Sequence, residues 1–509
     1  MSTETKSRES GVRLRIATLL FPPAGLLLLW TGSRSGWDRI TGTLGVLGYS
    51  VLYAAAVMYV LHLFFGLQFE MRGSPVPIPT FSPTRPDYEA LEAHRAGHPG
   101  PDPTNASRVI GDPYWTGFRG PRRDGHYDEM PVRTNWPADG LKALWRQPVG
   151  GGYASFAVAN GRAFTIEQRR AEEAVAAYDV ETGAELWVHG WPGLFQEWMG
   201  GDGPRSTPTW HEGKVYGLGA LGELRCLDAA TGELVWRRNL REDNRAPQLT
   251  YGFADSPLVV DDLVVVQAGG SNGGSVVAYH RLTGEPVWKS LDDPAAYSSP
   301  MEVELAGERQ LLVVTESRAV GLAVETGILL WEFPWKVLQG NRNIAQPVVL
   351  GADRFFLSAG YGTGCVAVEV ARTEEGFSAR EMWRNTNMKN KFTSSVLWEG
   401  HLYGLDESIL VCLDAETGER KWKDGRYGYG QLVLADGHLL ILAGDGDLAL
   451  VKATPERHVE LARFPAIDGK TWNHPAIAGG RIFVRNSAEM ACFDLAPPKG
   501  VSPPKGVSQ

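Results

Sequence analysis

The sequence predicts an all-β protein: an eight-bladed propeller of four-stranded antiparallel blades, closed by an N-terminal strand and preceded by one or two transmembrane helices. Three observations lead to this fold. A short motif recurs along the chain, the tryptophans that end it are regularly spaced, and a second marker gives the same number of units. Repeats of about 40–50 residues that contain only strands and turns are typical of propellers with four strands per blade.

The recurring motif is best seen in residues 177–187, Ala-Tyr-Asp-Val-Glu-Thr-Gly-Ala-Glu-Leu-Trp. The side chain of Asp179 can bond to the backbone two residues on, and Gly183 permits a positive φ, so D-x-x-T-G predicts a tight turn between two antiparallel strands. Further copies begin at Cys226, Ala278, Gly321 and Cys412, and a degraded copy runs from Ala367 to Trp383. Because the first residue of each copy is small, we expect the tryptophan of a neighbouring unit to cover it.

The tryptophans that end the motif give the first count of blades. Consecutive members lie 39 to 52 residues apart when Phe464 is taken as the eighth. The predicted structural docking residues are Trp145, Trp187, Trp236, Trp288, Trp331, Trp383 and Trp422.

A second marker gives an independent count, because each unit opens with small or polar residues before an apolar strand. The eight openings are residues 154–156, 206–208, 255–257, 298–300, 345–347, 393–395, 429–431 and 473–475. The last opening leads to no tryptophan, and Trp145 has no opening before it. The strand around Trp145 is therefore predicted to complete the last blade and close the ring.

The repeat resembles the tryptophan-docking motif of the eight-bladed quinoprotein propellers, the pyrroloquinoline quinone (PQQ) dehydrogenases. It is also similar to the PQQ-like repeats of the outer-membrane assembly lipoprotein B, which carries no quinone. The entry Trp-Thr-Gly-Phe-Arg-Gly-Pro-Arg-Arg-Asp-Gly at 115–125 looks like the lead-in of bacterial PQQ-like repeat proteins, and the resemblance covers residues 115–495. The dehydrogenase resemblance implies PQQ held beside calcium by carboxylate and amide oxygens. Asp255 and Asn343 are possible oxygen ligands, but no motif fixes them, and the adjacent cysteine pair of many such enzymes is missing.

The chain before the propeller contains two apolar runs. The run at 43–69 exceeds the roughly 20 residues needed to span a bilayer. The run at 14–30 is broken by Pro22 and Pro23, and it could form either a second span or a half-inserted hairpin. The predicted organisation is a membrane anchor (1–72), a proline-rich linker (73–113), the PQQ-like propeller (114–496) and a disordered tail (497–509).

Two arguments about the orientation of the propeller disagree. The basic residues that precede the first run would place the propeller inside the cell by the positive-inside rule. The family resemblance implies an extracytoplasmic propeller. We follow the resemblance and predict a protein of the bacterial inner membrane with a periplasmic propeller.

Charge and metal-ligand spacing limit the function classes. The net charge of −9 argues against a nucleic-acid partner. No histidine pair has the spacing of a zinc site, and we predict no metal ligands.

The loops that lead into the inner strands are long and polar, and ring closure would bring them to one rim. The candidate funnel residues are Arg205, Asp255, Asn343, Gln346, Lys391, Gln431, Trp472, Asn473 and His474. They could form a polar mouth for a ligand, in which Arg205, Lys391 and His474 bring donors. They could equally cap the loops and satisfy buried backbone groups.

Two functions remain open at this point. The first is a non-catalytic binding scaffold at the cell envelope, whose partner is another envelope protein or a small ligand. The alternative is a PQQ- and calcium-dependent dehydrogenase that oxidises an alcohol or a sugar. The missing cysteine pair and the unmatched calcium ligands favour the scaffold, without a confidently assigned cofactor or catalytic residue.

Overall fold

A computed structural model describes residues 13–19, 21–31, 35–70, 77–81, 84–98, 100, 114–197, 200–338 and 342–497. The chain forms two compact units: residues 1–70 with 77–83, and residues 71–76 with 84–509. Each unit is described by itself. Much of the linker predicted over 73–113, and the predicted tail apart from Pro497, lie outside the described residues.

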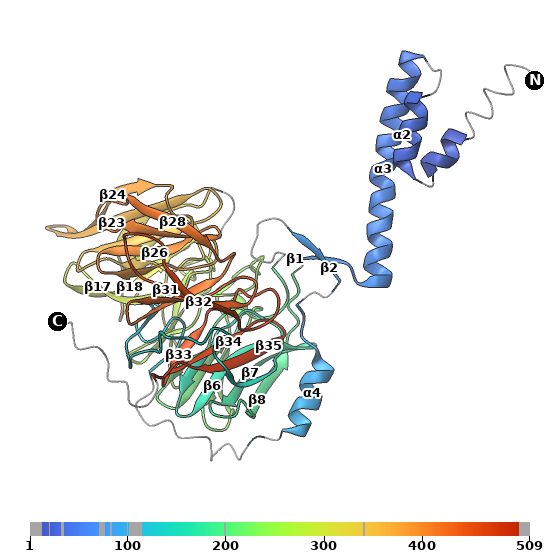
Figure 1. Ribbon diagram of the computed structural model, residues 1–509. Helices are drawn as coiled ribbons and strands as arrows, with labels where there is room; N and C mark the ends of the chain where they lie inside the picture. Colours follow the sequence, from blue (N-terminus) through green and yellow to red (C-terminus); the bar gives the residue numbers. More distant parts are fainter. Residues whose placement is uncertain are drawn as a thin grey trace, which may run out of the picture. The chain divides into compact units, whose positions relative to one another are not determined.

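The first unit is largely helical (Figure 1). It contains α2 (Pro22–Thr31), α3 (Gly36–Phe65) and the two short paired strands β1 (Gln68–Glu70) and β2 (Ile78–Thr80). Helix α3 has 30 residues, which at about 1.5 Å per residue exceeds the roughly 30 Å of a bilayer core. Among the described residues it is the one helix long and apolar enough to cross a membrane.

The predicted limits of the two apolar runs need correction. Helix α3 begins at Gly36 rather than near residue 43, and it ends at Phe65 because Gly66 turns the backbone into the left-handed region. The residues that follow leave the helix and form β1 instead of extending the span to residue 69. In the first run, α2 starts at Pro22, where proline is tolerated in the first helical turn, so that run is not one continuous helix.

The second unit contains the predicted eight-bladed propeller, and the predicted fold class is confirmed. Blade 1 consists of β5 (Ala157–Ala159), β6 (Arg162–Arg169), β7 (Glu172–Asp179) and β8 (Glu185–Pro192), and blade 2 of β9 (Thr209–His211), β10 (Lys214–Leu218), β11 (Glu223–Asp228) and β12 (Leu234–Asn239). Blade 3 consists of β13 (Leu258–Val260), β14 (Leu263–Gln267), β15 (Val276–His280) and β16 (Pro286–Ser290), and blade 4 of β17 (Met301–Leu305), β18 (Glu308–Val314), β19 (Arg318–Ala323) and β20 (Leu329–Pro334).

Blade 5 consists of β21 (Val348–Val349), β22 (Arg354–Ala359), β23 (Gly364–Thr373) and β24 (Gly376–Asn385), and blade 6 of β25 (Val396–Trp398), β26 (His401–Asp406), β27 (Ile409–Asp414) and β28 (Arg420–Arg426). Blade 7 consists of β29 (Gln431–Ala435), β30 (His438–Leu442), β31 (Asp447–Lys452) and β32 (Glu460–Pro465), and blade 8 of β33 (Ala476–Ala478), β34 (Arg481–Arg485), β35 (Glu489–Asp494) and β4 (Ala143–Pro148). Blade 7 gains β3 (His126–Tyr127), which runs parallel to β29. A short helix, α5 (Leu240–Asn244), follows β12.

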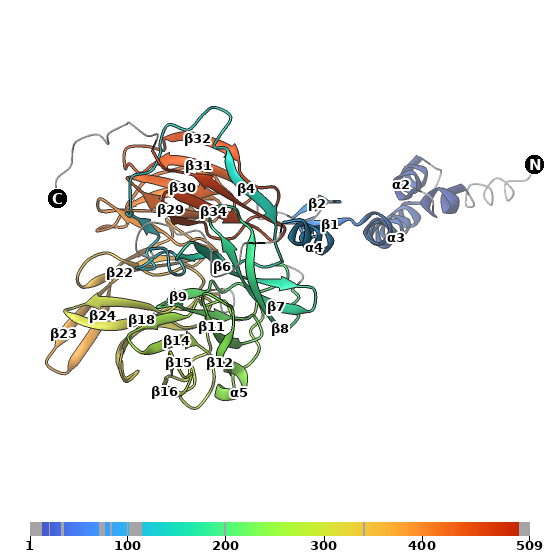
Figure 2. The same ribbon diagram turned by 90° about the horizontal axis from the view of Figure 1, so that it is seen from below.

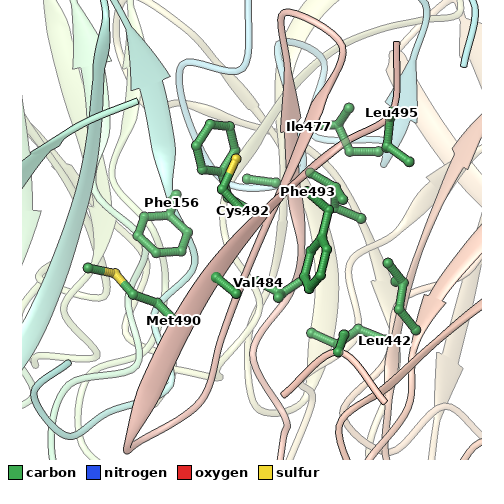
Figure 3. Close-up of a cluster of buried hydrophobic side chains, with 14 of the residues drawn as sticks. Phe156, Leu442, Ile477, Val484, Met490, Cys492, Phe493 and Leu495 are labelled. Carbon is green, nitrogen blue, oxygen red and sulfur yellow. The ribbon is translucent and has the colours of Figure 1, made fainter. Parts of the chain in front are cut away.

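The N-terminal strand closes the ring as predicted. Strand β4 pairs antiparallel with β35, and Trp145 lies opposite Cys492. Both overall views show β34 of the last blade beside β6 of the first (Figures 1 and 2). The interface is apolar: Phe156, which precedes β5, lies near Met490 of β35 in a fully buried cluster (Figure 3).

Helix α4 (Tyr88–Gly97) belongs to the second unit. It packs where the first and last blades meet. Arg95 pairs with Glu185 of blade 1 at 2.6 Å, and the ring of His94 hydrogen-bonds to Gln147 of β4 at 3.1 Å. The contacts join α4 to both sides of the closure.

Six of the seven motif tryptophans dock on the turn of the following blade. In these six, the indole N–H donates to a backbone carbonyl there: Trp145 to Val180, Trp187 to Ala229, Trp236 to Arg281, Trp288 to Val324, Trp383 to Ala415 and Trp422 to Thr454. Trp331 differs because the blade that follows it is the degraded repeat, whose third and fourth strands are joined by a long hairpin. Its indole N–H bonds to Gln310 of its own blade instead.

The small first residue of the motif has a different neighbour from the one we expected. Ala177 pairs across the strands with Trp187 of its own blade, and Gly321 pairs in the same way with Trp331. A side chain added at Gly321 would meet the indole of Trp331. The tryptophan of the same blade, rather than of a neighbouring one, therefore requires the small residue.

A candidate ligand-binding mouth on the propeller axis

The openings that marked the blades form a hydrogen-bonded girdle around the axis. The amide N–H of the middle residue of one opening donates to the side chain of the middle residue of the next, from Ser155 to Thr207, Thr207 to Ser256, Ser256 to Ser299, Ser299 to Gln346 and Gln346 to Ser394, at 2.8–2.9 Å. The hydroxyl of Ser155 donates to the carbonyl of His474 at 2.6 Å and links the first blade to the last. The polar openings are thus explained in large part by folding.

A cavity of about 370 Å³ lies on one side of this girdle, and we call it the mouth cavity. It is lined by Phe118, Tyr153, Ser155, Gly200, Arg205, Thr207, Tyr251, Ala254, Tyr297, Ser299, Arg342, Ile344, Tyr361, Lys391, Phe392, Ser394, Gln431, Trp472 and His474. Its size lies within the usual range for small-molecule sites, about 300–1,000 Å³.

The wall of the mouth cavity follows the repeat. In seven of the eight blades, the residue immediately before the opening lines the cavity: Tyr153, Arg205, Ala254, Tyr297, Ile344, Phe392 and Trp472. The middle residue of the opening contributes to the floor in five blades, through Ser155, Thr207, Ser299, Ser394 and His474. Because successive residues of an extended chain point to opposite sides, the first residue of each opening faces away.

The floor also includes the lead-in segment 115–125, which enters the axis of the ring. Phe118 lines the mouth cavity, and Arg119 and Arg123 of the same segment are buried. Arg119 donates to the carbonyls of Ser394 and Ser395 in blade 6, and Arg123 donates to the carbonyls of Ser256 and Pro300 in blades 3 and 4, among others. The segment therefore acts as an axial plug that ties opposite blades together.

His474 is held neutral in the floor. Its Nδ1 lies 2.8 Å from the carbonyl oxygen of Pro475, which requires a proton on Nδ1, and its Nε2 then accepts from Arg119 at 3.2 Å. Burial and the adjacent guanidinium lower the pKa of His474 to about 3. His474 therefore does not bring the donor to the cavity that the sequence suggested.

Four cations surround the mouth cavity and lie against aromatic rings. Arg205 lies over Tyr153, at 5.4 Å from the ring centroid, and Arg342 lies over Tyr361 at 4.9 Å. Lys391 lies 4.4 Å from the ring of Tyr429, and Lys470, at the edge, lies 3.9 Å from that of Trp472. The rings of Phe392 and Trp472 are 4.7 Å apart. Such cation–aromatic contacts stabilise the charged forms modestly, by about 0.5–2 kcal/mol each.

The charge of the lining is one-sided. It contains Arg205, Arg342 and Lys391, and none of its residues is an aspartate or a glutamate. Burial lowers the pKa of both Arg205 and Lys391. The cavity suits an anionic ligand with an apolar face.

The structure brings together five of the nine predicted funnel residues. Arg205, Lys391, Gln431, Trp472 and His474 line the mouth cavity, whereas Asp255, Asn343, Gln346 and Asn473 do not.

The four that lie elsewhere bond to backbone groups around the axis. Asp255 accepts from the amide of Gln267 at 2.8 Å, and Asn473 donates to the carbonyl of Ala154 at 2.8 Å. Asn343 donates to the carbonyl of Thr315 at 2.9 Å, and Gln346 belongs to the girdle. They have the loop-capping role that the sequence left open.

Sequence reasoning missed much of the aromatic wall. Tyr153, Tyr297 and Phe392 could have been found, because they share the repeat position of Arg205 and Trp472. Tyr251, Arg342 and Tyr361 were also missed, and they lie on loops of unequal length. No repeat spacing marks them.

The residues present do not fit a calcium ion in the mouth cavity. Calcium needs six to eight oxygen ligands, usually with carboxylates among them. The lining offers hydroxyl groups and one glutamine beside three cations. Over the described part of the chain, no group of three or more His, Cys, Asp or Glu side chains could hold a metal ion.

Comparisons with known proteins agree with this fold. A family model described as "Outer membrane protein assembly factor BamB" matches residues 171–424. The quinohemoprotein alcohol dehydrogenase ADH-IIG of Pseudomonas putida is 34% identical over 102 residues, which cover 19% of this chain and 14% of that protein. The outer membrane protein assembly factor BamB of Burkholderia pseudomallei is 24% identical over 216 residues, 41% of this chain and 52% of that protein. The crystal structure of BamB from Moraxella catarrhalis is 15% identical, covers 71% of this chain and 99% of that one, and has a TM-score of 0.51.

These findings identify the repeats, and the resemblance seen in the sequence is confirmed. The chain is a PQQ-like β-propeller protein, similar both to assembly factors and to quinoprotein dehydrogenases. The chain matches about half, or less, of the length of these curated relatives. The fold alone does not separate the two functions.

Proposed function

We propose that this protein is a membrane-anchored, non-catalytic binding module of the cell envelope, and that a small ligand or a segment of a partner protein enters its mouth cavity. The observation that carries the proposal is the composition of that cavity, which combines three cations and a wall of aromatic rings with no carboxylate. Such a lining can bind and orient an anionic group. It offers no aspartate or glutamate as a general base.

The membrane anchor in this proposal is α3. Its length and apolar composition support a span. The printed name of the BamB relatives, an outer membrane protein assembly factor, supports an envelope location with another envelope protein as partner. We place the anchor in the bacterial inner membrane and the propeller on the periplasmic side. Protease added to spheroplasts should then cleave the propeller, whereas cleavage only after lysis would place it in the cytoplasm.

The second candidate is a PQQ- and calcium-dependent dehydrogenase. Similarity to ADH-IIG favours it, and Arg205, Arg342 and Lys391 could hold the acid groups of a bound quinone, which would supply the redox chemistry. The calcium ion of that reaction has no matching ligand set in the mouth cavity.

The test is to supply the purified full-length protein with PQQ and Ca²⁺, and to measure dye reduction with primary alcohols and sugars. A quinoprotein dehydrogenase serves as the positive control for the reagents. We expect no turnover, with or without Ca²⁺. Calcium-dependent turnover that is lost in Arg205→Gln would overturn the non-catalytic proposal.

A further inference from the structure

The cations around the mouth cavity are bonded mainly to neutral groups. The guanidinium of Arg205 donates to the carbonyls of Gly203 and Gly201, at 2.6 and 2.7 Å. The ammonium of Lys470 donates to the carbonyl of Gly200. Backbone carbonyls satisfy the N–H groups of these side chains but carry no net charge, although the carboxylates of Glu197 and Asp202 lie near enough to attract the guanidinium of Arg205.

The other two cations are similar. Arg342 lies between the rings of Tyr251 and Tyr361, at 5.3 and 4.9 Å from their centroids. Lys391 donates to the hydroxyl of Tyr429 at 2.8 Å. Within the described residues, the one ion pair of these four cations joins Lys391 to Glu407, at 3.9 Å.

A further positive charge lies directly under the floor. Arg119 is fully buried and donates to backbone carbonyls and to the neutral His474. The carboxylate that attracts it, Asp124, is already paired with Arg122 at 2.9 Å. In a chain of net charge −9, the mouth cavity is thus a local site of positive charge. Clefts of one sign with low-dielectric walls concentrate ligands of the opposite sign.

The wall supplies the second recognition feature. Phe392 and Trp472 form one apolar face, and Tyr251 and Tyr297 form another, with ring centroids 5.8 Å apart. We propose that the mouth cavity selects small organic anions in which one or more acidic groups are attached to an apolar body, and that it does so without a metal ion. This inference deepens the proposed function and rests on it.

Two probes with the same naphthalene body but different charge test the proposal. They are 2,6-naphthalenedicarboxylate and the neutral 2,6-bis(hydroxymethyl)naphthalene, titrated calorimetrically into the full-length protein in a non-ionic detergent with EDTA. We expect the dicarboxylate to bind about tenfold tighter or more, because a charge-assisted hydrogen bond contributes about 1.5–3 kcal/mol. Raising the salt concentration should weaken the binding of the dicarboxylate and leave the binding of the neutral probe unchanged.

Variants place the binding in the mouth cavity. Arg205→Gln combined with Lys391→Gln should weaken the dicarboxylate at least about tenfold and leave the neutral probe nearly unchanged. The matched control is Arg309→Gln, which removes a positive charge from an exposed ion pair with Asp261. It should change neither affinity. Trp472→Leu should weaken both probes, because it removes part of the apolar face.

Equal affinity for the two probes, or a dicarboxylate affinity that the double variant does not change, would overturn the inference. Neither result would create calcium-dependent turnover, so the proposed non-catalytic function would remain. Conversely, turnover with PQQ and Ca²⁺ would end the non-catalytic proposal even if the cavity prefers anions.

Discussion

The contact between Trp187 and Gly232 allows a quantitative test of how the blades are joined. The indole of Trp187 is 7% exposed and donates to Ala229 in the turn of blade 2. Gly232 lies in the same turn with φ +76°, and a Cβ atom there would be 2.6 Å from the indole ring. Trp187→Ala should lower the free energy of unfolding by about 3–5 kcal/mol, as for other buried aromatic side chains.

Gly232→Ala should lower the free energy of unfolding through two separable contributions. The left-handed backbone costs roughly 1–2 kcal/mol for a residue with a Cβ, and the clash with the indole adds about 1–3 kcal/mol. In the Trp187→Ala background the clash disappears, so only the backbone cost remains. The two substitutions should therefore be coupled by about 1–3 kcal/mol.

Gly213 is a matched control in the same blade. Its φ is +75°, and a Cβ there would have nothing within 4 Å. Gly213→Ala should cost the backbone strain alone, and it should cost the same with or without Trp187. The assay is urea unfolding at 25 °C followed by circular dichroism. If Gly232→Ala were as costly without Trp187 as with it, the docking account would be wrong.

Two further predictions concern buried charges. Burial raises the pKa of Asp255 to about 7, so its contribution to stability is complete below about pH 4 and is lost as the pH rises through 7. As the pH rises from 4 to 8, the free energy of unfolding of Asp255→Asn should therefore increase relative to that of the wild type by up to about 4 kcal/mol. A difference in urea midpoints that does not change with pH would refute this. Arg119→Gln should cost at least about 2 kcal/mol and lower the Tm, because it leaves the carbonyls of Ser394 and Ser395 without their donor. An unchanged Tm would show that the axial plug does not stabilise the ring.

The fold could be predicted because its main contacts repeat. Most docking tryptophans need a tight turn in the next blade, so the motif recurs along the sequence. The closure was visible because Trp145 has no opening before it, while the last opening has no tryptophan after it. The turn before the N-terminal strand also contributes a glycine: Gly140 lies against the ring of Phe464. The glycine of the T-G turn contacts the docking tryptophan in the same way at other interfaces. The limits of α3 were less predictable, since its apolar pattern continues past Gly66.

The candidate site was only partly predictable, because the repeat did not show which way each side chain points. Asp255 and Arg205 both precede an inner strand, but they occupy neighbouring positions of the repeat. In an extended chain, neighbouring positions point to opposite sides. Arg205 therefore faces the mouth cavity, while Asp255 faces the backbone of Gln267 at the end of β14. The axial plug was hidden for another reason: Arg119 and Arg123 bond to backbone carbonyls far away in the chain, and any sequence could supply those.

The charge selectivity of the mouth cavity is the central claim, and the position of a bound anion tests it most directly. Crystals of the full-length protein can be soaked in EDTA with a brominated naphthalenedicarboxylate, and the bromine located by anomalous diffraction. We predict one strong peak inside the mouth cavity, between Trp472 and the cations Arg205, Arg342 and Lys391. A bromine peak found only on the outer strands of the blades, with none in the mouth cavity, would contradict the account.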